Sequence, residues 1–417
     1  MVEYRPRVVD DELARRMSVM GAVLVDGPKA AGKTATASQV AQTVLRLDVD
    51  RSARAALQTY PEQLFTYPTP ILFDEWQEAP EIWNLVRRAV DDSADKGQYL
   101  LTGSATPRDD ARLHSGAGRI ARLRMRPMTL FESGHSNGSV SLADLLNGAD
   151  LGGAPSDLTV PDIIERIVAG GWPDTLRFGE RDAREWLEAY VLNIAEVDLP
   201  ALGTRRNPGN ILRLFASLGR ASGTPLNRSV LELEVGGEGG AVASETLARY
   251  LDALDRLMLI EPLPAWRPHM RSRVRLRTSP VHHFVDPSVG LAALGVGSRE
   301  LLADLEAAGL QFESMALRDL RVYAQPLRGR FSSWRDSKSG HEVDAVLELA
   351  DGRWAAFEFK LGEAAADVAA TSLLRFRDTV DVGKHGAPSA LVVITGGRFA
   401  YRRSDGVIVV PIAALRP

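Results

Sequence analysis

One stretch decides the fold of the first part of the chain: GAVLVDGPKAAGKT, residues 21–34. Its first half is a short apolar run that predicts a buried strand. Its second half fits the pattern G-x-x-x-x-G-K-S/T, and a helical pattern over residues 33–45 follows. Glycines let such a loop wrap backbone N–H groups around phosphate oxygens, and the positive end of the next helix faces the same charge, a context that a chance glycine turn would lack. We therefore predict a loop that binds the phosphates of ATP, formed by Gly27, Pro28, Lys29, Ala30, Ala31, Gly32, Lys33 and Thr34.

A second apolar run, PILFDE at residues 70–75, ends in two carboxylates. Carboxylates at the end of a hydrophobic strand are costly to bury without a function, although a solvated loop is the alternative. We expect Lys33 to reach the β- and γ-phosphates, and Thr34 and Asp74 to hold Mg²⁺, Asp74 through water. Glu75 is then the catalytic base that polarises the attacking water. Gln77 either orients the γ-phosphate side or is an ordinary surface glutamine.

A third apolar run, QYLLTGS at residues 98–104, completes a set of strands separated by helices, which predicts a parallel sheet covered on both faces. Ser104 or Thr102 is expected to sense the γ-phosphate or the attacking water, with a helix N-cap as the competing role. Downstream, GRIARLRMR at residues 118–126 alternates basic and apolar residues. Arg119 there is a candidate arginine finger, or else one half of an ion pair.

Length and composition limit the class of protein. A chain of 417 residues exceeds what one core usually serves, and 45% hydrophobic with 25% charged residues is ordinary for a soluble protein. No run of about 18 apolar residues and no signal-like N-terminus is present, so we expect a cytoplasmic protein without membrane contact. The absence of cysteine excludes disulfides and thiolate metal sites. A net charge of -4 means that any DNA contact needs a local basic patch.

The sequence predicts three domains, of which the first two are residues 1–140 and residues 141–280. Residues 1–140 are the predicted ATPase domain, and residues 141–280 carry helical patterns that end in SETLARYLDALDRLMLI and then RSRVRLRT. A helix followed by a basic strand is typical of the recognition helix and wing of a winged helix-turn-helix, which would place arginines against DNA phosphates. A solvated strand face is an equal alternative. The arginines concerned are Arg271, Arg273, Arg275 and Arg277.

Residues 281–417 predict a mixed α/β domain with a carboxylate cluster. Glu313 lies in a helical pattern, while HEVDAVLEL and AAFEFKL are strand-like alternations that put Asp344, and then Glu358 and Lys360, on single faces. Glu313, Asp344 and Glu358 could bind a divalent metal and activate water for attack on a phosphodiester, with Lys360 stabilising the developing charge. The alternative is a hairpin with one solvated face, which commonly carries such residues.

The order of these motifs resembles a family of bacterial and archaeal AAA+/STAND-like ATPases that carry a C-terminal domain of unknown function. The resemblance rests on GPKAAGKT, ILFDEWQ, LLTGS and GRIARLRMRPMTLFE, and then on GGWP, SPVHHFVDPSVG, FES, HEVD and FEFK, and it covers essentially the whole chain. It implies a P-loop ATPase domain, a winged-helix-like middle module and a PD-(D/E)xK nuclease-like fold. Glu313, Asp344, Glu358 and Lys360 fall on the motif of that fold. This sequence departs from the pattern at Ala105, where a second polar residue often stands.

The expected protein is thus α/β, with a parallel-sheet P-loop ATPase domain, a helical winged-helix-like module and a mixed α/β nuclease-like domain. Two functions fit. The first is an ATPase that uses Mg²⁺ and ATP, acts on or with DNA, and controls a C-terminal metal-dependent nuclease by its nucleotide state. The second is an ATP-driven switch with an inert nuclease-like domain, whose partner is DNA, a regulatory protein or another copy of the chain.

Overall fold

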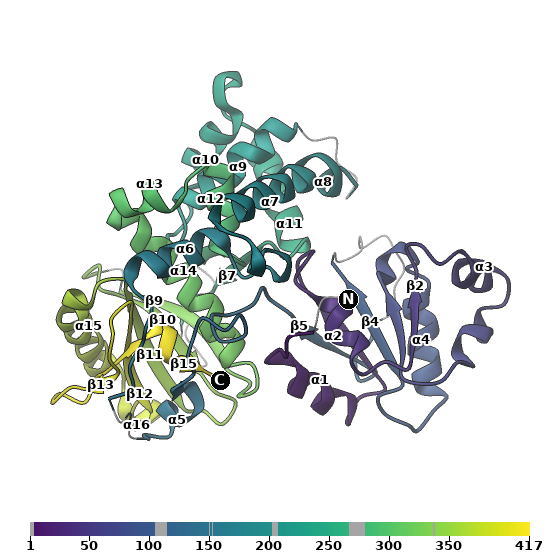
Figure 1. Ribbon diagram of the computed structural model, residues 1–417, viewed down its shortest axis with the longest axis horizontal. Coiled ribbons are helices and arrows are strands. Elements are labelled where there is room, and N and C mark those ends of the chain that lie inside the picture. The colour runs from purple at the N-terminus through teal and green to yellow at the C-terminus, as the bar shows by residue number, and fades with distance from the viewer. Residues whose placement is uncertain are drawn as a thin grey trace. The chain divides into compact units, whose positions relative to one another are not determined.

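The computed structural model describes residues 4–104, 115–149, 151, 153–201, 207–266, 280–336 and 338–417 (Figure 1). The chain forms two compact units, one of Met1–Pro127 with Asp255–Met258 and one of Met128–Leu254 with Leu259–Pro417. Ala105 and the four arginines of the basic stretch, Arg271, Arg273, Arg275 and Arg277, lie outside the described residues. Within the described part of the chain, no helix is long and apolar enough to cross a membrane.

The first unit is built on a five-stranded sheet in the order β2-β3-β4-β1-β5. All neighbouring strands are parallel, which confirms the predicted parallel sheet. Its strands are β1 (Ala22–Asp26), β2 (Thr43–Arg46), β3 (Ile71–Asp74), β4 (Tyr99–Gly103) and β5 (Ile120–Arg124). Its helices are α1 (Val9–Met17), α2 (Lys33–Ser38), α3 (Arg51–Thr59) and α4 (Ile82–Asp91), with 3₁₀ turns η1 (Pro61–Phe65) and η2 (Trp76–Glu78).

Both faces of this sheet are buried, because alternate residues of the central strands enter two separate cores. Leu24, Phe73 and Leu101 pack in one core with side chains of α3 and α4. Val23 and Leu72 enter the other, where α1 and α2 supply the cover. A strand that is covered on both sides has to be apolar throughout, which is why these strands are readable in the sequence.

The helix predicted over residues 33–45 is wrong in its second half. Helix α2 ends at Ser38, and Thr43–Arg46 forms the edge strand β2, which pairs with β3. Along β2 only Leu45 is fully buried, because an edge strand has one face toward the core. Apolar residues in so short a run fit a helical period as well as a strand period, and tertiary pairing decides between them.

The second unit begins with a helical part, as predicted in its coarse form. Its helices are α5 (Leu142–Leu146), α6 (Val160–Ala169), α7 (Glu180–Asn193), α8 (Leu199–Ala201), α9 (Pro208–Arg220), α10 (Arg228–Gly236), α11 (Ser244–Arg256), α12 (Pro287–Leu294), α13 (Ser298–Ala303) and α14 (Leu305–Tyr323). A π-helical stretch, Ile194–Asp198, joins α7 to α8. Strands β7 (Ile260–Leu263) and β8 (Val281–Phe284) form an antiparallel pair after α11, and Pro225 bridges to Val281.

The C-terminal part of this unit is a six-stranded mixed sheet in the order β13-β14-β12-β11-β10-β9. The strands are β9 (Arg330–Arg335), β10 (Glu342–Glu348), β11 (Trp354–Lys360), β12 (Ala390–Thr395), β13 (Tyr401–Arg402) and β14 (Ile408–Pro411). Strands β9, β10 and β11 are antiparallel neighbours, and β12 runs parallel to β11 after helix α15 (Ala366–Thr379). Helix α16 (Val382–His385) follows α15, and β6 (Val140–Ser141) pairs with β15 (Leu415–Arg416) near the C-terminus.

Candidate functional site

The parallel register brings three strand ends to one edge of the first sheet. Asp26 of β1 lies opposite Gly103 of β4, and Phe73 of β3 lies opposite Leu101 of β4. Since parallel strands end at the same edge, the loop after β1, Glu75 after β3 and Ser104 after β4 all lie there. Strand β4 lies between β3 and β1, so the loop and the carboxylates are two strand spacings apart, roughly 10 Å.

The loop of residues 27–34 has the backbone that the motif predicts. A Cβ atom on Gly27 would come 2.2 Å from the Met125 backbone oxygen, so this position has room only for glycine. Gly32 has a left-handed φ of 96° and begins helix α2, which glycine adopts at little cost. The loop thereby turns back on the sheet before the helix starts.

Lys33 is held inside this loop. Its Nζ donates to the Pro28 backbone oxygen at 2.8 Å, and the side chain is only 5% exposed. Burial lowers the pKa of Lys33 to about 8, although Glu75, Asp74 and Asp26 pull it upward. The loop therefore contains a cation that lacks most of its solvation, and an anionic ligand such as a phosphate would restore it.

Thr34 and Asp74 meet beside this lysine. The Thr34 hydroxyl donates to Asp74 Oδ1 at 2.7 Å, and the Thr102 hydroxyl donates to the same oxygen. A hydroxyl and a carboxylate are the hard oxygen ligands that Mg²⁺ takes, so the two predicted residues fit this ion. Thr102, considered as a γ-phosphate sensor, instead fixes the orientation of Asp74.

Glu75 directly follows β3 with a left-handed φ of 53°, which is uncommon for a residue with a Cβ atom. Its Oε2 accepts a hydrogen bond from the Gln77 side-chain amide, and the Ser104 hydroxyl lies 3.4 Å from the same oxygen. Ser104, predicted as a polar sensor, thus lies at the predicted base. Gln77, left open between two roles in the sequence, is a partner of Glu75 rather than a surface residue.

Arg119 lies at the other edge of the sheet. It precedes Ile120, which pairs with the first residue of β1, whereas the loop follows the last. Five strand residues separate the two edges by roughly 16 Å, and Arg119 Nε donates to Asp91 at 2.8 Å. Arg119 therefore forms the ion pair that was the alternative, and it lies at the edge of the sheet away from its own phosphate loop. Arg122 and Arg124, which sequence reasoning did not single out, pair with Asp26 at 3.3 Å and 3.2 Å, next to the loop.

In the C-terminal sheet, the predicted strand residues come together around a lysine. Lys360 Nζ lies 2.8 Å from Glu358 Oε2 and 3.4 Å from Asp344 Oδ2, and the Phe359 N–H donates to Asp344 at 2.8 Å. Burial and then the charge of Asp344 raise the pKa of Glu358 to about 7. Burial opposes the charge on Lys360, but Asp344 and Glu358 outweigh it and raise its pKa.

Glu313 of α14 approaches this cluster without completing a metal site. Burial and then the charge of Asp344 raise the pKa of Glu313 well above its usual range, which indicates that the two acids lie near each other. Yet in the part of the chain that the structure describes, no group of three or more His, Cys, Asp or Glu side chains is placed to hold a metal ion. The metal site of Glu313, Asp344 and Glu358 stays a prediction, and in the structure Lys360 lies between the two strand carboxylates.

Two hydrogen-bond partners in the C-terminal cluster were not foreseen. The Ser372 hydroxyl of α15 donates to Glu358 Oε1 at 2.8 Å, and His341 Nε2 lies 3.0 Å from Ser372 Oγ. Which of the two groups donates depends on the tautomer of the His341 ring. No local sequence signal marks Ser372, which is one helical residue among many.

A buried ionic network in the second unit was also missed. Arg318 of α14 binds Asp286 at 2.5 Å and Asp319 at 2.7 Å, and all three side chains are almost fully buried. Asp319 accepts from the Leu130 N–H, and Asp286 accepts from the Gly171 N–H, each at 2.9 Å. The network therefore fixes three sequence-distant segments, and the only sequence signals were the VDPS and RD motifs.

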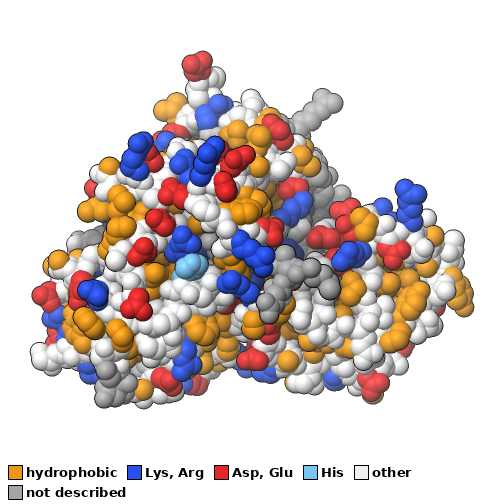
Figure 2. All heavy atoms as spheres, viewed as in Figure 1, with side chains coloured by type: hydrophobic (Ala, Val, Ile, Leu, Met, Phe, Trp, Pro, Cys, Tyr) orange, Lys and Arg blue, Asp and Glu red, His pale blue; other side chains and the backbone are white. Residues whose placement is uncertain are grey.

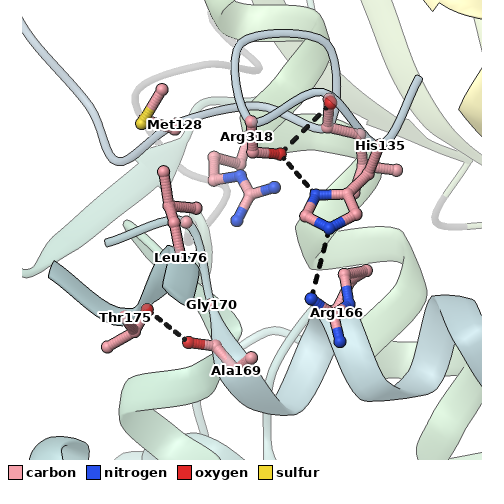
Figure 3. Close-up of a pocket in the computed structure, with 11 residues that line it drawn as sticks. Met128, His135, Arg166, Ala169, Gly170, Thr175, Leu176 and Arg318 are labelled. Atoms are coloured by element: carbon pink, nitrogen blue, oxygen red, sulfur yellow. Dashed lines mark hydrogen bonds between the residues drawn. The ribbon is translucent and has the colours of Figure 1, made fainter. Parts of the chain in front are cut away.

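A small pocket lies beside Arg318 (Figure 3). His135 lies between Ser133 and Arg166, with its Nε2 3.2 Å from Arg166 Nη1 and its Nδ1 2.9 Å from Ser133 Oγ. The free volume of about 10 Å³ is enough for one water molecule and far too small for a nucleotide.

On the face of the molecule in Figure 2, basic and acidic side chains are interspersed.

Comparison with known proteins divides the chain into three matched regions. Residues 20–133 match an AAA domain, residues 160–300 match the domain of unknown function DUF8612, and residues 308–415 match the domain of unknown function DUF4143. Two uncharacterized proteins, Rv2008c of Mycobacterium tuberculosis and Mb2031c of Mycobacterium bovis, are 26% identical over 406 residues, which are 96% of this chain and 82% of theirs.

Solved structures give weaker matches. A variant of RuvB from Thermotoga maritima matches at 18% identity and a TM-score of 0.26, over 61% of this chain and 89% of that one. Drosophila ORC bound to DNA matches at 16% identity and a TM-score of 0.21, over 69% and 85%. The chain therefore carries an N-terminal P-loop ATPase domain of the AAA type, followed by two domains of unknown function, and it is a homologue of the mycobacterial proteins.

Proposed function

We propose that this protein is a Mg²⁺-dependent ATPase that works on or with DNA and changes the state of its second unit with its bound nucleotide. The observation that carries the proposal is the convergence of Lys33, Thr34, Asp74 and Glu75 at one edge of the sheet. Thr34 and Asp74 would hold Mg²⁺, which supplies charge neutralisation to the phosphates when bound.

The chain's own residues supply the other parts of the reaction. The loop's N–H groups and the start of α2 bind phosphate oxygens, and Lys33 exchanges its bond to Pro28 for bonds to the β- and γ-phosphates. Glu75 takes the proton of the attacking water. ATP turnover by the purified chain tests this scheme, with Lys33→Ala as the inactive variant and Lys96→Ala, an exposed lysine outside the loop, as the control. Equal turnover by Lys33→Ala would refute it.

DNA binding is proposed for the middle of the chain. Helices α9, α10 and α11 precede the antiparallel pair β7 and β8, and Pro225 adds a third strand position, which is the order of elements in a winged helix. The four alternating arginines Arg271, Arg273, Arg275 and Arg277 lie between β7 and β8 in the sequence. If these arginines contact phosphates, replacing all four by alanine should reduce the slope of log affinity against log salt by about 3–4 for a duplex probe. An unchanged slope would exclude this stretch as the DNA contact.

Nuclease activity is a second candidate function. It is favoured by the juxtaposition of Asp344, Glu358 and Lys360 on neighbouring strands and by the order α14, β9, β10, β11, α15, β12. Against it, Lys360 forms ion pairs with both carboxylates, and no group of three metal ligands is found among the described residues. Incubation with plasmid DNA and Mg²⁺ or Mn²⁺ decides. Nicking that Asp344→Ala abolishes would establish the nuclease, and intact plasmid with DNA-stimulated ATP turnover would establish the switch.

A further inference from the structure

The glutamine of the DEWQ motif is placed to act on the catalytic carboxylate. Gln77 lies in η2, two residues after Glu75. A Cβ atom on Gly103 would come 2.7 Å from Gln77 Oε1 and 2.7 Å from Trp76 Nε1. The glycine in β4 therefore leaves room for a side chain that reaches from β3 across the neighbouring strand.

The two oxygens of Glu75 have different surroundings. Oε2 accepts the hydrogen bond from Gln77 Nε2 and lies 3.4 Å from the Ser104 hydroxyl. Oε1 accepts no hydrogen bond from the residues that the structure describes. Among the carboxylates that raise the pKa of Lys33, Glu75 has the largest effect. One oxygen of Glu75 is thus anchored, and the other has no hydrogen-bond partner among the described residues.

The chemistry of the anchor suits this task. An amide donates a hydrogen bond without adding charge, whereas an acid in its place would repel Glu75. Gln77 Oε1 is buried and, within the described ranges, has no hydrogen-bond partner. A buried acceptor without a partner is unfavourable and calls for a structural or functional explanation. Here the amide keeps its donor side on Glu75 rather than turning to satisfy its own oxygen.

We propose that Gln77 is a positioning residue for ATP hydrolysis: it holds Oε2 of Glu75 so that Oε1 faces the attacking water. This inference rests on the ATPase function and on Glu75 as its base. Gln77 itself touches neither water nor nucleotide in this role. Its effect is to remove the rotational freedom of a carboxylate whose backbone alone would leave several directions open.

The test measures kcat, KM and ATP affinity for Gln77→Ala, with Gln63→Ala, an exposed glutamine of the same unit, as the matched control. We expect kcat of Gln77→Ala to fall about 10- to 100-fold, because a misplaced catalytic group costs about that much. KM and ATP affinity should stay within about twofold, which also demonstrates a folded site. An unchanged kcat, or a loss of ATP binding in a folded variant, would overturn the proposal.

Two further readouts separate positioning from general support of the structure. In a Glu75→Gln background, Gln77→Ala should cause no additional loss, because its partner carboxylate is gone. Gln77→Glu should regain activity relative to wild type as the pH falls, since a protonated acid can again donate to Glu75. Additive losses or a flat relative pH profile would contradict the inference. Wild-type turnover is measured first, so its absence would overturn the ATPase function before any Gln77 variant is compared.

Discussion

Replacement of Lys33 by methionine should abolish ATP binding and yet stabilise the nucleotide-free protein. Burial lowers the pKa of this lysine from 10.5 to about 8, which corresponds to about 3.4 kcal/mol at about 1.4 kcal/mol for each factor of ten in proton affinity. Methionine fills a similar volume without charge. The lost hydrogen bond to the Pro28 oxygen offsets about 1 kcal/mol of the gain. We therefore expect the unfolding free energy to rise by about 2 kcal/mol.

The pH dependence gives an independent check with a defined sign. Because the folded-state pKa of Lys33 lies below its unfolded value, the unfolded chain binds more protons between about pH 8 and pH 10.5. The free energy of unfolding of the wild type should thus rise as the pH rises through that window, because Lys33 loses its proton in the folded state first. Lys33→Met should lack the gain, so the two stability curves should converge toward pH 10.5.

Urea denaturation followed by circular dichroism measures both effects. The transition that ATP shifts in the wild type belongs to the unit that contains the loop. Lys96→Met, at an exposed lysine of the same unit outside the loop, is the control and should change stability by less than about 0.5 kcal/mol. If Lys33→Met lowered the unfolding free energy, or if its pH profile matched the wild type, the view of Lys33 as an undersolvated cation would be refuted.

Four other substitutions, one of them a control, probe separate features. Glu75→Gln should bind ATP but slow single-turnover phosphate release by about 10²- to 10⁴-fold, and a normal rate would exclude Glu75 as the base. Arg318→Met leaves two buried carboxylates without their cation and should cost about 3–5 kcal/mol in urea denaturation. Arg249→Met, at an exposed ion pair on α11, should cost less than about 0.5 kcal/mol, and equal effects would disprove the burial argument. Gly27→Ala would bring a Cβ atom 2.2 Å from the Met125 oxygen, so calorimetry should detect no ATP binding; normal affinity would mean that the loop can shift.

The N-terminal fold was readable because its determinants are local. Strands buried on both faces have to be apolar, and a loop that wraps phosphate needs its glycines at fixed spacing. Strand β2 was not readable, since a four-residue edge strand with one buried position has no period that excludes a helix. Pairing with β3, which local sequence does not encode, determines it.

The site residues divide in the same way. Lys33 and Thr34 follow β1 through the phosphate loop, and Asp74 ends β3. A parallel sheet places the ends of β1 and β3 at the same edge, so these three residues come together. Arg119 precedes β5, whereas the phosphate loop follows β1. Because these strands are parallel, Arg119 and the loop lie at opposite edges of the sheet. The partnership of Gln77 with Glu75 depends on how a side chain crosses β4, which no spacing rule predicts.

In the C-terminal part, the sequence correctly grouped acids and lysine by strand alternation but not their arrangement. Alternation assigns residues to a face, and it leaves open whether Lys360 lies between the carboxylates or beside them. The Lys360 ammonium lies within 3.4 Å of both Asp344 and Glu358, which makes the cluster an ion-pair network as it stands. The network around Arg318 was beyond reach because it joins segments that are distant in the chain.

The left-handed backbone at Glu75 has a consequence for which residues can replace it during evolution. A residue with an ordinary side chain pays roughly 1–2 kcal/mol in that region, while glycine and asparagine enter it with ease. Stability therefore favours glycine or asparagine at position 75, whereas ATP hydrolysis requires glutamate. A related protein that no longer hydrolyses ATP would therefore be free to carry asparagine or glycine at this position. The residue found there in a related sequence would then indicate whether ATP hydrolysis has been retained.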